Sequence, residues 1–152
     1  MRFLKKEGVP FVDREIQTGM GRTGKFFAVE HFGIEPDIIS IAKGIASGLP
    51  LGAIIAKANI MQSWKPGQHA SIFGTNPVAV AAALATLEVV KSEKLIQNAK
   101  KMGEIAMKRL NEIEERHEVI GDTGGAWVVY RCRNSQRQED ERTRREGKLC
   151  GQ

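Results

Sequence analysis

The sequence has few cysteines and no long apolar run, and each scarcity excludes a class of protein. It contains 2 cysteines, Cys132 and Cys150, which lie among charged residues without Cys-x-x-Cys spacing or a nearby histidine. We therefore expect no metal site and no structural disulfide. No stretch of about 18 consecutive apolar residues occurs, so we expect no membrane-spanning helix. Charged residues appear too early for a signal peptide, and we expect a cytoplasmic protein.

The basic excess is concentrated near the C-terminal end. The formal net charge is +5, and residues 131–152 carry +3 of it. This segment contains no aromatic side chain for stacking on bases and shows no periodic helix face. We therefore expect no nucleic-acid partner, and binding through this segment ranks last among the functions considered.

Three short apolar runs predict strands. They cover residues 9–16, 37–42 and 51–56, and glycine- or proline-containing turns lie between them. Apolar and polar residues alternate little in these runs, which is typical of strands covered on both faces. The runs therefore favour an α/β fold with a mostly parallel sheet.

Two helices follow with different patterns. Asn76 is a good N-cap and Pro77 suits the first helical turn, after which residues 78–91 are apolar almost all round. We expect this helix to be buried. Apolar residues then recur at three- and four-residue spacing from Leu95 to about His117, which predicts an amphipathic helix on a surface.

One lysine stands out because it ends an apolar run. Lys43 follows the second predicted strand and precedes Gly44 and Gly48. A lysine held among tight turns at a sheet edge can lose its proton more readily and form a Schiff base with an aldehyde cofactor. Taken alone, a lysine that ends a strand and reaches solvent is the simpler interpretation.

Five ordered segments resemble the class III pyridoxal-phosphate aminotransferases, with the 4-aminobutyrate aminotransferase type nearest. The segments 15–25, 35–39, 42–44, 48–53 and 73–77 read EIQTGMGRTGK, EPDII, AKG, GLPLGA and FGTNP. The resemblance implies a fold-type I large domain and the cofactor pyridoxal 5'-phosphate. It also implies amino-group transfer from an amino acid or ω-amino acid to a 2-oxo acid, and a homodimer with active sites completed across the interface.

The resemblance assigns roles to two residues. Lys43 would be the lysine that binds the cofactor covalently and moves the proton at the substrate carbon. Gln17 would contact the phenolic oxygen of the cofactor. The cofactor carries out the carbanion chemistry, and the protein supplies orientation and charge.

Two positions depart from the family pattern. Arg14 stands where the family has an aspartate that keeps the pyridine nitrogen protonated, and Asp13 points to the other face of a strand. Ile72 stands where the family has a threonine whose hydroxyl binds the cofactor phosphate. Ser71 or Thr75 would be the nearest replacements.

The resemblance also divides the chain. Residues 1–75 would be part of the cofactor-binding large domain, and 76–122 would lead into the small domain. Residues 123–152 are predicted to be a disordered tail produced by a frameshift. Codons allowed for 131–142, read one base later, can encode Gly-Val-Glu-Ile-Val-Lys-Asp-Arg-Lys-Thr-Lys, which is how the family continues.

We therefore expect a truncated member of this family that is catalytically defective. Family members are longer, and the glycine-rich phosphate-binding turn and the aromatic residue that stacks on the ring would precede Met1. The alternative is a non-catalytic remnant that acts as an interaction module through uncovered sheet and helix faces, or that has no function.

Overall fold

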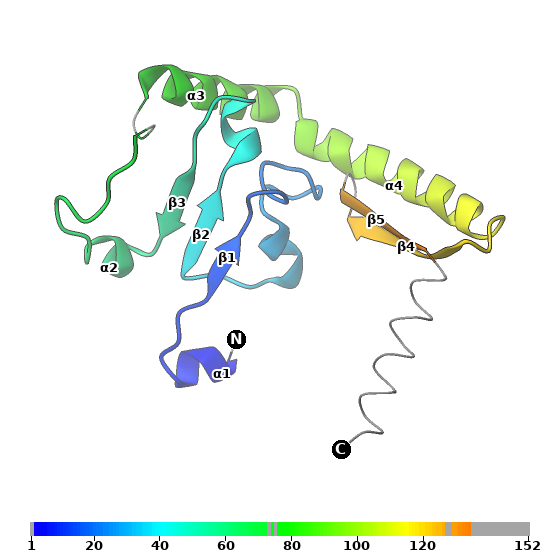
Figure 1. The fold of residues 1–152 in the computed structure, drawn as a ribbon, viewed down its shortest axis with the longest axis horizontal. Helices are drawn as coiled ribbons and strands as arrows, with labels where there is room; N and C mark the ends of the chain where they lie inside the picture. Colours follow the sequence, from blue (N-terminus) through cyan, green and yellow to red (C-terminus); the bar gives the residue numbers. More distant parts are fainter. Residues whose placement is uncertain (1, 73, 75, 127–128, 135–152) are drawn as a thin grey trace. The chain divides into compact units, whose positions relative to one another are not determined.

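The computed structural model describes residues 2–72, 74, 76–126 and 129–134 (Figure 1). The chain divides into two units, Met1–Asn98 and Ala99–Gln152, and each is described by itself. The first unit holds a three-stranded sheet and the candidate site. The second holds most of one long helix and a two-stranded sheet.

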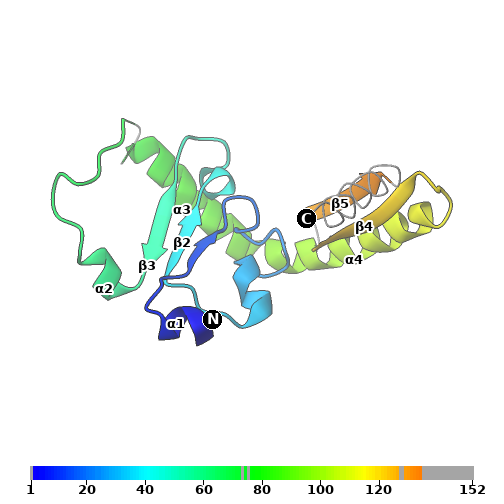
Figure 2. The same ribbon diagram turned by 60° about the horizontal axis from the view of Figure 1, so that its bottom comes forward.

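The sheet of the first unit is mixed. Its strands are β1 (Val12–Arg14), β2 (Ile38–Ile41) and β3 (Ala53–Ala56), in the order β1-β2-β3. Strand β1 runs parallel to β2, whereas β3 runs antiparallel to it. Figure 1 shows the three strands side by side, and Figure 2 shows β2 and β3 from a second direction. The α/β class is confirmed, while the predicted parallel arrangement applies to one of the two pairings.

Four short helices precede, connect and follow these strands. They are α1 (Arg2–Lys6), the 3₁₀ helix η1 (Ala28–Phe32), the 3₁₀ helix η2 (Lys43–Ala46) and α2 (Ala58–Met61). Because η2 begins directly after β2, the chain turns sharply at the end of that strand. The carboxyl ends of β1 and β2 lie at the same edge of the sheet, since the two strands are parallel.

Helix α3 (Pro77–Ser92) begins where the sequence predicts. The Asn76 side chain accepts a hydrogen bond from the Val78 N–H at 3.0 Å, and Pro77 occupies the first turn. The prediction that this helix is buried all round is wrong, because Val78 is 65% exposed and Leu84 60%. An apolar composition allows every face of a helix to be buried, but a face becomes buried only where another element packs against it.

The core of the first unit joins the sheet to η2 and α3. Its buried residues are Met20, Ile41, Ile45, Ala46, Ala83 and Val90. A hydrogen bond of 2.9 Å between the hydroxyls of Ser47 and Thr86 adds a polar contact beside this core. The turn that follows β2 is therefore held in place by the packing of its apolar side chains, Ile45 and Ala46, in this core.

The second unit pairs a helix with a hairpin. Helix α4 (Leu95–Glu114) confirms the predicted amphipathic helix, and β4 (Ile120–Ala126) pairs antiparallel with β5 (Val129–Asn134). The described part of the predicted disordered tail, 123–126 and 129–134, thus forms strands, because backbone pairing needs no apolar side chains. Residues 127–128 and 135–152 of that tail lie outside the described residues.

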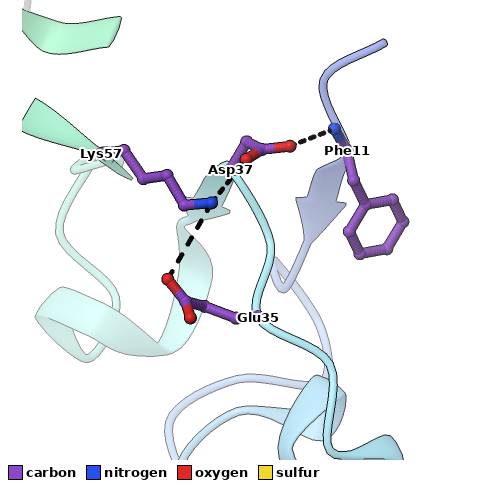
Figure 3. Close-up of polar contacts among 4 residues, drawn as sticks. All are labelled: Phe11, Glu35, Asp37 and Lys57. Atoms are coloured by element: carbon purple, nitrogen blue, oxygen red, sulfur yellow. Dashed lines mark hydrogen bonds and ion pairs between the residues drawn. The ribbon is translucent and has the colours of Figure 1, made fainter. Parts of the chain in front are cut away.

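An aspartate links the strands at the opposite end of the sheet, where β2 begins. Asp37 accepts a hydrogen bond from the Phe11 N–H at 2.8 Å and one from the Lys57 ammonium at 2.7 Å (Figure 3). The bond to Asp37 raises the pKa of Lys57 above its usual value. Phe11 precedes β1 and Lys57 follows β3, so one carboxylate joins all three strands.

We expect Asp37→Ala to lower the free energy of unfolding by about 1–3 kcal/mol, because the Phe11 N–H loses its acceptor. Urea denaturation of the full chain measures the change. Glu35→Ala is the matched control: this carboxylate lies 4.0 Å from the Lys57 nitrogen and is 83% exposed, so its removal should change stability by less than about 1 kcal/mol. Equal losses in the two variants would contradict the role of Asp37.

Candidate active site

Lys43 stands at the edge of the sheet where β1 and β2 end. It is the first residue of η2, two positions after β2, and its side chain is exposed. Its φ of 52° lies in the left-handed region, which costs a non-glycine residue about 1–2 kcal/mol. Such strained residues gather at functional sites, so this backbone supports Lys43 as a site residue.

A loop rich in glycine lies against the Lys43 turn. It covers residues 15–24 and follows β1 directly. A Cβ placed on Gly44 would lie 3.7 Å from the Cβ of Met20, and Met20 is buried in the same core cluster as Ile45. The loop carries Gln17, which is exposed. The structure therefore brings the segments that hold Gln17 and Lys43 to the same edge of the sheet.

Arg14 is the last residue of β1 and is exposed. It pairs with Ser40 across β1 and β2. Its side chain leaves the opposite side of the strand from those of Asp13 and Glu15, since neighbouring residues alternate. The alternation that separates Asp13 from position 14 is thus present in the structure.

Asp13 belongs to a pair of acidic side chains on the inner face of β1. Burial raises its pKa above the usual value, the hydrogen bond and the negative charge of Glu15 raise it further, and a hydrogen bond to the Arg14 backbone lowers it. One of its oxygens, Oδ2, is buried and has no hydrogen-bond partner among the described residues. Asp13 therefore binds a proton more readily than an isolated aspartate does.

Glu15 is the residue that sequence reasoning missed. It is 1% exposed, and its carboxylate accepts hydrogen bonds from the Val29 N–H at 2.9 Å and from the Thr18 hydroxyl. A signal was present, because Asp13 and Glu15 share a face of the predicted strand. Nothing in the sequence showed that the face turns inward.

The structure does not bring the remaining predicted site residue into this arrangement. Ile72 lies in the segment before α3 and is 96% exposed. Thr75 lies outside the described residues. Ser71 is exposed, and its carbonyl oxygen accepts a hydrogen bond from the Gly74 N–H at 3.2 Å.

The described residues hold neither a cluster of metal-ligating side chains nor a membrane-spanning helix. Within the described part of the chain, no group of three or more histidine, cysteine, aspartate or glutamate side chains is placed to hold a metal ion. No helix among the residues that the structure describes is long and apolar enough to cross a membrane.

The chain is similar to aminotransferases in sequence and in fold. A family model described as aminotransferase class-III matches residues 2–149. A leucine/methionine racemase of Thermococcus litoralis is 47% identical over 128 residues, which cover 84% of this chain and 29% of that protein. An acetylornithine aminotransferase of Archaeoglobus fulgidus is 47% identical over 117 residues, which cover 77% of this chain and 31% of that protein.

A solved structure shows the same likeness. The ornithine δ-aminotransferase of Plasmodium falciparum superposes with a TM-score of 0.84 at 36% identity, over 90% of this chain and 35% of that one. The chain thus spans about a third of the length of the proteins that it matches.

Asp13→Asn tests the acidic pair. Since the folded state raises the pKa of Asp13, the folded chain holds this proton more tightly than the unfolded chain does. The free energy of unfolding should therefore fall as pH rises from the ordinary pKa of 3.8 through the raised value. Asparagine does not titrate, so the variant should be more stable than the wild type at pH 7 and lose that advantage near pH 4.

Urea denaturation at the two pH values measures this difference. Glu35→Gln is the control, because this carboxylate is 83% exposed and its replacement should leave the pH dependence unchanged. A pH dependence in Asp13→Asn equal to that of the wild type would contradict the raised pKa.

Proposed function

We propose, since the chain belongs to the class III aminotransferases, that it is the part of such an enzyme that carries the cofactor-binding lysine, Lys43. Enzymes of this family depend on pyridoxal phosphate. The observation that carries the proposal is the position of Lys43: an exposed lysine with a φ of 52° at the end of β2, beside a glycine-rich loop.

Two of the four described site residues fit this cofactor. Lys43 supplies the amine that the aldehyde needs, and Gln17 supplies an amide that can donate to an oxygen of the ring. Both are exposed and belong to segments at the same edge of the sheet. When bound, the cofactor supplies the electron sink for chemistry at the substrate carbon.

The other two residues do not fit. Arg14 is a cation where the ring nitrogen calls for a carboxylate, and a cation there favours the unprotonated ring. Ile72 has no hydrogen-bonding group for a phosphate. We therefore propose that the chain alone gives no measurable transamination, because positioning and electrostatic terms act together in catalysis.

For the whole protein we propose amino-group transfer between an amino acid and a 2-oxo acid in a homodimer. The 4-aminobutyrate type stays a prediction, because the relatives compared above are named as a racemase and as acetylornithine and ornithine aminotransferases. Those names favour an amino donor of the acetylornithine or ornithine kind. A panel of amino donors, tested on the whole protein, distinguishes the two.

The frameshift also stays a proposal. The match to the family model reaches residue 149, so it includes most of the segment 123–152 that the frameshift is proposed to have altered. Resequencing the gene from independently prepared DNA tests the proposal, and codons that cannot encode the shifted series would reject it.

Lys43→Ala tests the role of the lysine. Titration of the full chain with pyridoxal phosphate should produce the absorbance of the covalently bound cofactor, and the variant should lose it, because no other residue is proposed to attach the aldehyde. Lys91→Ala is the matched control, since Lys91 is an exposed lysine of α3. Loss of the signal in both variants, or in neither, would contradict the assignment.

Arg14→Asp, in the same titration, tests the misfit at position 14. A carboxylate there can bond the protonated ring nitrogen, and a hydrogen bond to a charged group is worth about 1.5–3 kcal/mol. We expect affinity for the cofactor to rise about tenfold or more. Unchanged or weaker binding would show that position 14 does not face the ring.

A second candidate function is supported by exposed apolar faces. On α3, Val78 and Leu84 are 65% and 60% exposed, and on the outer strand β3, Ile54 and Ile55 are 48% and 49% exposed. Such surfaces are typical of binding sites for other chains. The chain would then act as a non-catalytic interaction module.

Size-exclusion chromatography tests this candidate. The interaction module predicts oligomers that form without cofactor and do not change when pyridoxal phosphate is added. A monomer, or an oligomer that appears only with the cofactor, would reject it in favour of the cofactor-binding role.

A further inference from the structure

We infer that Glu15 is a positioning residue, whose buried carboxylate holds the loop 16–24 against the Lys43 turn. The inference deepens the proposed function and rests on it for the link to the cofactor. The contacts of Glu15 themselves do not depend on that function.

The hydrogen bonds of Glu15 reach into three segments. Oε1 accepts from the Val29 N–H at 2.9 Å, and Oε2 accepts from the Thr18 hydroxyl. The backbone N–H donates to the Ser40 carbonyl at 2.9 Å, and the carbonyl accepts from the Gly19 N–H at 3.0 Å. Glu15 thus joins β2, the loop and η1.

The position of the Glu15 side chain requires a hydrogen-bond acceptor. The Val29 N–H can only donate, so the side chain that meets it must accept. Burying a charged group is costly unless hydrogen bonds satisfy it, and Glu15 is 1% exposed with both oxygens bonded. The cost of moving this carboxylate therefore opposes any displacement of the loop.

Close packing between the loop and the Lys43 turn couples the position of the loop to the position of Lys43. A Cβ on Gly19 would lie 2.7 Å from the Glu15 carbonyl oxygen, so this approach of the backbone requires glycine. The next residue, Met20, is buried, and its Cβ lies 3.7 Å from the Cβ position of Gly44. A shift of the loop would therefore move Met20, which packs in the same core cluster as Ile45 of the turn that begins at Lys43.

Gln17 is held by the same network. It lies between Glu15 and Thr18, the two residues whose side chains are bonded. Its own side chain is exposed, so the position of its Cα is determined by the backbone of its neighbours and not by contacts of the side chain. The carboxylate thus fixes the two proposed cofactor contacts, Gln17 and Lys43, relative to each other.

The experiment compares four variants of the full chain by hydrogen exchange at single amides. Glu15→Gln keeps the shape but weakens the bonds, and Thr18→Val removes one donor with little change in volume. Thr18→Ser restores the hydroxyl and is the conservative rescue. Glu30→Gln is the matched control, because this exposed carboxylate of η1 accepts a hydrogen bond of 2.8 Å from the N–H of Phe27, the residue before the helix.

We expect Glu15→Gln to speed exchange at Gly19 and Val29 about tenfold or more, since bonds to charged groups are the strong ones. Thr18→Val should speed exchange at Gly19 and leave Val29 unchanged, and Thr18→Ser should match the wild type. Glu30→Gln should leave Gly19 unchanged. Equal exchange in Thr18→Val and Thr18→Ser, or a uniform increase that includes Ile41 of β2, would overturn the inference.

Affinity for pyridoxal phosphate, measured by absorbance, separates positioning from a purely structural role. Thr18→Val should weaken binding severalfold at an unchanged urea midpoint, and Thr18→Ser should restore it. Weakened binding in Thr18→Val that Thr18→Ser does not restore would overturn the link to the cofactor. A wild-type chain that binds no cofactor would reject the proposed function, while the exchange rates would still decide whether Glu15 holds the loop.

Discussion

The buried carboxylate of Glu15 is the constraint on which the candidate site depends. A charged group that is 1% exposed must have its hydrogen bonds made, and here the carboxylate accepts them from Thr18 of the loop 16–24 and from Val29 of η1. The polar network fixes the arrangement of these segments together with the apolar core, which includes Met20 of the loop, Ile41 of β2 and Ile45 of η2.

The strand directions then determine where the candidate site residues lie. Parallel β1 and β2 bring Arg14, Gln17 and Lys43 to one edge, and the polar tie at Asp37 lies at the opposite edge. One edge of the sheet thus stabilises the fold, and the other presents exposed polar side chains. Lys43 can hold a strained φ of 52° because the core packed against its turn determines its backbone conformation.

The sequence predicts the elements with strong local signals. The Asn76 cap and Pro77 give the start of α3, and the period of the apolar residues gives α4. What it cannot give is which faces another element covers, as the exposed Val78 and Leu84 show. The burial of Glu15 was missed for the same reason, because it depends on partners distant in sequence.

The site was predictable to a different degree at each position. The placement of Lys43 after β2 was anticipated from the run that it ends, and the motifs gave its family. The strand β5 differs from the prediction, because polar composition is typical of disorder while backbone pairing leaves little trace in composition.

Lys43 is the lysine that we propose attaches the cofactor. The most direct test is to incubate the full chain with pyridoxal phosphate, reduce it with borohydride and locate the modified lysine by peptide mass spectrometry. The account predicts that the label is found on Lys43. A label found on other lysines, such as Lys25 or Lys65, with Lys43 unmodified would contradict it.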